Sequence, residues 1–149
     1  AAKQVVTYCI RNDIGTLIVG YNTTFQRSSD LGRQMNQVFV GISFGILRRK
    51  LKYLCEMNGI RYVEQEESYT SMASFWDLDE MPVYGEAGLV PPVFSGCRIC
   101  RGLYQDRSGR RINADVNGAL NIMRKCNIVS LRALYDRGDV DTPVRIRIA

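Results

Sequence analysis

Two short segments carry acidic side chains in positions that suit metal-dependent chemistry. Glu66 and Glu67 close a stretch that is typical of a β-strand, and Asp115 lies near the start of an expected helix. Acids at the carboxyl end of a parallel strand and at a helix start converge on one edge of an α/β sheet. Carboxylate oxygens there could hold Mg²⁺, which prefers oxygen ligands. Two such ions could activate water and stabilise the leaving oxygen of a phosphodiester.

Each acid also has an ordinary explanation. An Asp in the first turn of a helix, such as Asp115, interacts favourably with the helix dipole, and a pair such as Glu66 and Glu67 is common at a solvated strand end. Gly118 and Ala119 add no bulk beside Asp115, as the close approach of a substrate would require. The residues alone leave both explanations open.

The composition excludes several kinds of site. The chain has no His, so a Ser-His-Asp or Cys-His hydrolase and a zinc site with His ligands are ruled out. Five Cys is an odd number, which favours a reducing compartment over a disulfide framework. No apolar run approaches the roughly 18 residues of a membrane span, and the first residues lack the layout of a secretory signal. We therefore expect a cytoplasmic location and no membrane partner.

Positive charge is concentrated toward the carboxyl-terminal end. Residues 97–149 carry 11 of the 20 Lys and Arg residues but only 5 of the 15 acids, and ten of those 11 are Arg. Arg guanidinium groups match phosphate oxygens bidentately, so this end is a candidate phosphate-binding surface. A solvated, solubilising face is equally compatible with the charge alone.

The positions of these acids depend on the strands and helices that carry them. Residues 16–21 (TLIVGY) form a β-branched apolar run that is typical of a buried strand. A helix follows, with Ser43 as its expected cap and Asn58-Gly59 as its end, and residues 60–67 form a second strand. Strand, helix and strand in this order predict a right-handed crossover with two parallel, adjacent strands, and hence an α/β fold.

The segments outside this unit are expected to be less regular. Residues 3–11 are typical of the end of a helix, and the polar residues 22–37 of an exposed loop. The turn signals within residues 68–111 predict irregular structure or a small β-ribbon insertion. Residues 130–135 could add a short helix, and residues 139–149 have little to order them.

The helix that carries Asp115 has clear boundaries in the sequence. Asn113 is its expected cap, and it should end near Lys125. Its apolar stripe is predicted to contain Val116, Ala119, Leu120 and Met123.

Three motifs resemble the end of a known family. They are Tyr69-Thr70-Ser71, the pair Phe94-Ser95-Gly96 and Arg101-Gly102-Leu103-Tyr104, and residues 112–122 (INADVNGALNI). Together they resemble the carboxyl-terminal part of the TnpB/OrfB proteins of bacterial insertion sequences, which are relatives of the type V CRISPR nucleases. The resemblance extends over nearly the whole chain, and the Asn-Ala-Asp-x-Asn-Gly-Ala segment is its most specific part.

The resemblance implies an RNase H-like (RuvC-like) domain of an RNA-guided DNA endonuclease that uses three acids and Mg²⁺. The third acid corresponds to Asp115. The usual position of the second is Gly20, which cannot bind a metal, but some branches carry a glutamate that corresponds to Glu67, with Glu66 as the alternative. The first acid, on the initial strand of the sheet, would precede Ala1. The chain is therefore expected to be incomplete without an upstream Asp-bearing segment or partner chain.

The family also implies a zinc ribbon with two Cys-x-x-Cys pairs. Only Cys97 and Cys100 form such a pair here, and the other pair corresponds to Ser74 and Asp77. Ser is a poor zinc ligand, so we expect a degenerate ribbon without zinc.

The resulting prediction is a partial RNase H-like domain in four segments: residues 1–67, the ribbon-like insertion 68–111, the final helix 112–127 and a basic tail 128–149. Its function would be metal-dependent hydrolysis of DNA, with guide RNA and DNA as partners. Glu67 and Asp115 would bind the metal. Nucleic acid would be bound by Arg98, Arg101, Arg110 and Arg111. The alternatives are a non-catalytic nucleic-acid-binding or assembly module derived from such a nuclease, and a fragment without a role of its own.

Overall fold

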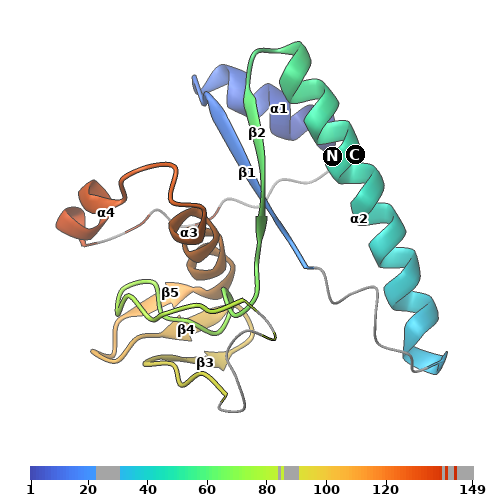
Figure 1. Cartoon of the computed structure of the whole chain (residues 1–149). Helices are drawn as coiled ribbons and strands as arrows, with labels where there is room; N and C mark the ends of the chain where they lie inside the picture. The colour runs from blue at the N-terminus through green and yellow to red at the C-terminus, as the bar shows by residue number, and fades with distance from the viewer. Residues whose placement is uncertain (23–30, 84, 86–90, 139, 141–142, 144–149) are drawn as a thin grey trace. The chain divides into compact units, whose positions relative to one another are not determined.

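The computed structural model describes residues 1–22, 31–83, 85, 91–138, 140 and 143, with only the backbone described over residues 31–43 (Figure 1). Two compact units make up the chain. The amino-terminal unit is Ala1–Glu64, and the carboxy-terminal unit begins at Gln65. None of the helices among these described residues is both long and apolar enough to cross a membrane.

The amino-terminal unit has the predicted strand-helix-strand order. Its elements are α1 (Ala2–Arg11), β1 (Thr16–Tyr21), α2 (Leu31–Met57) and β2 (Arg61–Glu66). The strands β1 and β2 pair with each other, and Figure 1 shows them running in the same direction. The N–H of Arg61 donates to the carbonyl of Gly15 at 2.9 Å and joins the starts of the two strands. The prediction of parallel, adjacent strands is confirmed.

The core of this unit lies between the two helices and the strands. Its buried side chains are Ala2, Val6, Cys9, Leu51, Cys55 and Ile60. Leu17 and Val19 of β1 pack against them but are only partly buried, as are the other residues of that strand. The prediction of a buried β1 was therefore wrong. Among the described residues this sheet has two strands, so β1 lacks the second neighbour that buries a central strand.

The helix α2 begins much earlier than its expected cap. It starts at Leu31, so Ser43 lies inside the helix, and residues 31–37 are helical rather than part of a loop. Residues 23–30 of the predicted loop lie outside the described residues. Arg33 and Gln34 are good helix formers although they are polar, and polarity alone suggested a loop. The helix ends as predicted: Gly59 follows it with φ of 68°, in the left-handed region that favours glycine.

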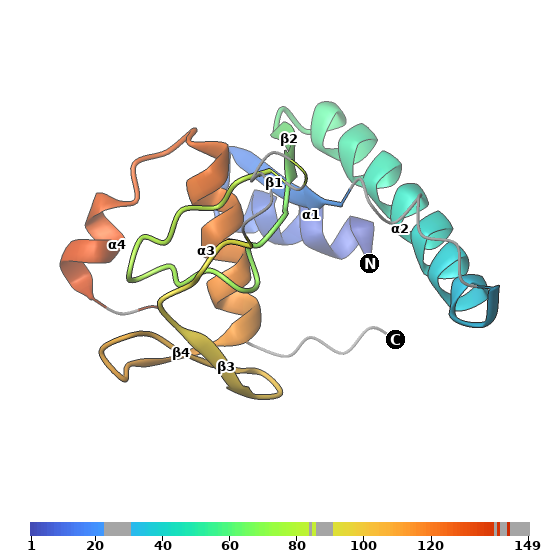
Figure 2. The same cartoon turned by 60° about the horizontal axis from the view of Figure 1, so that its bottom comes forward.

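The carboxy-terminal unit packs a helix against a small antiparallel sheet. The strands β3 (Cys97–Cys100), β4 (Leu103–Gln105) and β5 (Arg111–Asn113) form a sheet in that order. The helix α3 (Ala114–Cys126) packs on β4 and β5, and α4 (Arg132–Arg137) follows it (Figure 2). The expected β-ribbon within residues 68–111 is thus present, although its third strand extends to Asn113.

Aromatic side chains form much of the core of this second unit. Phe75 is fully buried and stacks on Tyr135 with ring centroids 4.8 Å apart. Tyr104 is also buried, and its hydroxyl donates to the carbonyl of Met72 at 2.8 Å. Gly96 lies against this tyrosine, and a Cβ at Gly96 would come within 2.7 Å of the Tyr104 ring and 2.4 Å of the Gln105 carbonyl oxygen. Only glycine fits there without a shift of the backbone.

Candidate metal and nucleic-acid site

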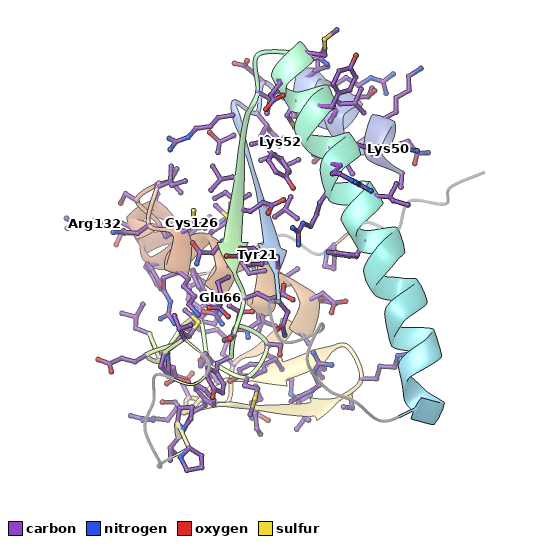
Figure 3. All side chains as sticks on the ribbon, turned by 45° about the vertical axis from the view of Figure 1, so that its right-hand side comes forward. Tyr21, Lys50, Lys52, Glu66, Cys126 and Arg132 are labelled. Atoms are coloured by element: carbon purple, nitrogen blue, oxygen red, sulfur yellow. The ribbon has the colours of Figure 1, made fainter. Side chains whose placement is uncertain are left out.

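Glu66 is neutralised by a lysine of α3. The Nζ of Lys125 lies 2.5 Å from Oε2 of Glu66, and the two side chains are only 11% and 13% exposed. Figure 3 labels Glu66 where β2 ends and Cys126, the residue after Lys125, at the end of α3. Lys125 also donates to the carbonyls of Ser68 and Pro82. Burial alone would raise the pKa of Glu66, but the bonds from Lys125 and Ser68 outweigh it and lower the pKa. The carboxylate of Glu66 is therefore already satisfied as an ion.

The pKa of Glu67, the next residue, shifts in the opposite direction. Glu67 is partly buried directly after β2, and burial, together with the negative charge of Glu66, raises its pKa. Its backbone carbonyl accepts from the N–H and the hydroxyl of Thr70, at 3.2 and 2.9 Å. The chain reverses here because Tyr69 adopts φ of 65°, a conformation that strains a non-glycine residue. Glu67 is the carboxylate of the pair that a cation would stabilise.

Asp115 lies in the first turn of α3, as predicted, and is exposed. Asn113 caps the helix: its Oδ1 accepts from the N–H groups of Asp115 and Val116 at 2.9 and 3.1 Å. The structure places Glu67 and Asp115 in the same unit and shows no direct bond between them. Within the described part of the chain, no three His, Cys, Asp or Glu side chains gather as a metal-binding group.

Buried amides join α3, the helix that carries Asp115, to the turn that follows Glu67. Asn117 and Asn121 are completely buried on α3, and neither belongs to the predicted apolar stripe of this helix. The Asn117 amide donates to the carbonyl of Ala73 at 2.9 Å and accepts from the N–H of Phe75 at 3.1 Å. Asn121 donates to the carbonyls of Thr70 and Ala73. Thr70 is the residue that binds the Glu67 carbonyl, so this network ties α3 to the glutamate turn.

One detail of α3 differs from the prediction. Ala119 was expected in the apolar stripe but is exposed, because the buried face turns toward Asn117 and Asn121. A Cβ at Gly118 would lie 4.0 Å from Ser71 Cα and the Thr70 carbonyl oxygen, so Gly118 faces the glutamate turn, and the expectation that it leaves room for a substrate stays a prediction. The signal in the sequence was the spacing of the two asparagines, four residues apart and hence on one face of the helix.

The four predicted arginines separate into two pairs. Arg110 and Arg111 line a cavity of about 460 Å³ together with Trp76, Asn113 and Val116. The Arg110 guanidinium carbon lies 4.6 Å from the centroid of the Trp76 ring.

Arg98 and Arg101 lie elsewhere in the same unit. Arg98 is on β3 and Arg101 is in the turn that follows, and both are exposed. Neither contributes to the cavity that Arg110 and Arg111 line.

The positions expected to correspond to a zinc ribbon are held together by hydrogen bonds. Ser74 is buried, and its Oγ accepts from the N–H of Asp77 at 3.2 Å. The Oδ2 of Asp79 accepts from the N–H groups of Ser74 and Ser95, at 2.8 and 2.9 Å, and so joins the two sides of this segment. Cys97 and Cys100 are exposed free thiols on β3.

Comparison with known proteins supports a nuclease-related origin. No curated protein matches the chain. The family model described as "Cas12f1-like, TNB domain" matches residues 44–122, which extend from within α2 to within α3 and include Glu67 and Asp115. This agrees with the coarser expectation of a chain related to the TnpB-type nucleases. Because the match spans more than half of its residues, the chain belongs to the Cas12f1-like TNB domain family.

Proposed function

We propose that this chain is the carboxyl-terminal, RNase H-like part of a TnpB-type RNA-guided DNA endonuclease, and that Glu67 and Asp115 bind its catalytic metal. The observation that carries the proposal is that two adjacent acids, Glu66 and Glu67, have different surroundings and opposite pKa shifts. Lys125 neutralises Glu66 at 2.5 Å, whereas the pKa of Glu67 is raised by burial and by the charge of Glu66. Among the described residues Glu67 has no ion pair like that of Glu66, and we propose it as the better of the two metal ligands.

The residues present fit Mg²⁺ in kind. Both proposed ligands supply carboxylate oxygens, which Mg²⁺ prefers, and Asp115 is exposed where a phosphate can reach it. Bound Mg²⁺ would supply Lewis acidity toward a phosphodiester and a water of lowered pKa. Two carboxylates are too few for a two-metal site. We propose that a further acid comes from another segment or a partner chain.

The residues of this chain would position the reacting strand. The Asn113 cap fixes the first turn of α3 and hence the backbone of Asp115. The Asn117 and Asn121 amides fix the turn that follows Glu67. Arg98, Arg101, Arg110 and Arg111 would bind the sugar-phosphate backbone of DNA or guide RNA, since phosphate contacts position a protein without reading sequence.

A second function, from a different class, is a nucleic-acid-binding or assembly module without catalysis. Gly20 at the usual position of the second acid favours it, as does the lack of a three-acid group among the described residues. The two functions differ in one measurable respect. A nuclease part binds DNA more tightly when a divalent cation joins its carboxylates to a phosphate, and a simple binding module does not.

The experiment measures the affinity of the chain for fluorescent single-stranded DNA with and without Ca²⁺, at constant ionic strength. Ca²⁺ should tighten binding by the wild type, and Glu67→Gln and Asp115→Asn should each abolish that gain. Glu80→Gln, at an exposed acid of the same unit, is the matched control and should keep it. Equal affinities with and without Ca²⁺ in the wild type would exclude the metal-binding role and leave the module. With Mg²⁺ in place of Ca²⁺, the chain alone should cut no DNA.

A further inference from the structure

Arg110 and Trp76 line the cavity beside the first turn of α3, and their surroundings hold both side chains in place. Arg110 lies over the Trp76 ring at 4.6 Å, pairs with the buried Asp106 at 3.7 Å and donates to the carbonyl of Gly138 at 3.3 Å. Trp76 is held by edge contacts to Phe75 and Tyr135, with ring centroids 5.1 and 6.0 Å away. The Arg110 side chain is nevertheless 45% exposed. This part of the cavity is therefore pre-organised and still reachable from solvent.

Arg111, the second arginine that lines the cavity, differs from Arg110 in its ion pairs. Arg111 is exposed at the start of β5, and no ion pair of its side chain occurs among the described residues. Much of the charge of Arg110 is compensated by Asp106. Arg111 is thus the cation of this cavity that remains available for an anion.

The position of the cavity connects it to the proposed metal site. Asn113 and Val116 line it, and Asp115 lies between them in the first turn of α3. Its volume of about 460 Å³ lies within the range of small-ligand pockets, roughly 300–1,000 Å³. A guanidinium held over an aromatic ring, a second guanidinium without an ion pair among the described residues and a nearby acid that we propose as a metal ligand together suit a nucleotide.

We propose that this cavity binds one unpaired nucleotide of a single-stranded nucleic acid, with its base against Arg110 and Trp76 and its phosphate on Arg111. The base must be unstacked, because a concave pocket cannot admit a base inside a duplex. Stacking on aromatic rings and guanidinium planes accepts every base, so the site holds a strand without reading its sequence. The proposal rests on the proposed function, since it seats the strand beside Asp115.

Trp76 makes the proposal directly measurable, because it is the single tryptophan of the chain. The probes are short oligo-dT and oligo-U strands and matching strands in which the bases are replaced by abasic sites. Intact strands should quench Trp76 fluorescence on binding and should bind roughly five-fold or more tightly than abasic strands. The ratio of the dT and U affinities then identifies DNA or RNA as the preferred source.

Three variants assign the roles within the cavity. Arg110→Lys keeps the charge but loses the plane, so it should bind intact and abasic strands almost equally. Arg111→Gln should weaken both kinds of strand and lower the log–log salt slope by about one unit. Arg132→Gln makes the same charge change on α4, where the side chain is 87% exposed and labelled in Figure 3. It should behave as wild type.

The outcomes separate this proposal from the function it rests on. If intact and abasic strands bind equally and leave Trp76 unquenched, the cavity proposal is overturned, and the nucleic-acid-binding function stands. Absence of binding to every strand at low salt would overturn both. If free dTMP binds as tightly as the strand and displaces it, the cavity is a mononucleotide site, and the proposal is again wrong.

Discussion

The ammonium of Lys125 lies 2.5 Å from a carboxylate oxygen of Glu66, in a pair of which each side chain is less than 15% exposed. This pair joins the end of β2 to the last turn of α3. Among the described residues the neighbouring Glu67 has no such ion pair, and burial and the charge of Glu66 raise its pKa. The two adjacent acids thus have different surroundings, which the sequence did not predict.

The first prediction concerns this ion pair. Lys125→Met should lower the free energy of unfolding of the carboxy-terminal unit by about 3–5 kcal/mol, because Glu66 stays buried without its partner. The double variant Glu66→Gln/Lys125→Met should recover most of that loss. Urea unfolding followed by Trp76 fluorescence measures this unit. A double variant no more stable than Lys125→Met would show that the lost packing of the lysine, rather than the unpaired charge, is the cause.

Asn117 gives the second prediction. Asn117→Leu should lower the free energy of unfolding of the same unit by about 1–3 kcal/mol, because the buried N–H of Phe75 loses its acceptor. The Ala73 carbonyl keeps its bond from Asn121 and adds little to the cost. Ala119→Ser, at an exposed position of the same helix, is the control and should change stability by less than about 0.5 kcal/mol. Equal effects of the two changes would contradict a specific role for the amide.

Asn113 and Asn117 show how far the sequence could predict the structure. Local signals were sufficient for the strand-helix-strand order, for the Asn113 cap and for the end of α2 just before Gly59, since each depends on residues close together in the chain. The buried amide of Asn117 binds Ala73 and Phe75, more than 40 residues away. A polar residue is expected to face solvent until such distant partners are known.

The candidate site was predictable to a similar extent. The motif around Asp115 and its place at a helix start were visible in the sequence. The resemblance predicts Glu67 as the metal ligand with Glu66 as the alternative, and that choice stays a prediction. The pairing of Glu66 with Lys125 was not predictable, because the two residues lie 59 positions apart in the chain. Likewise the sequence treated Arg110 and Arg111 as equivalent, whereas Asp106 and Trp76 engage only the first of them.

A third prediction follows from Asp79. Burial would raise the pKa of Asp79, but bonds from Ser95 and Ser74 outweigh it and hold the pKa below its usual value. The unfolded chain then binds more protons than the folded one in acid, so stability is present above the ordinary Asp pKa of about 3.9 and is lost as the pH falls through the folded value. The free energy of unfolding should fall as the pH drops below about 4, and Asp79→Asn should flatten that fall. If the pH dependence of the unfolding free energy is unchanged in Asp79→Asn, the Asp79 carboxylate is not its cause.

The fourth prediction concerns zinc. We expect well under one zinc per chain in the purified protein, because Ser74 is buried and bonded to Asp77 at the positions where the resemblance implies a second cysteine pair. Elemental analysis of the metal content tests this. Stoichiometric zinc that disappears in Cys97→Ser would contradict it and would mean that Cys97 and Cys100 find further ligands in Asp77 or in a second copy of the chain.

The most direct test of the account is whether Glu67 and Asp115 bind one metal together. Mn²⁺ broadens the NMR signals of nearby amides, so in a titration of the ¹⁵N-labelled chain we expect the amides of Ser68 and Val116 to lose intensity at the same Mn²⁺ concentrations. Asp115→Asn should remove the broadening at both positions, and Glu80→Gln should keep it. Broadening at only one of the two amides, or broadening at Ser68 that survives in Asp115→Asn, would contradict the account.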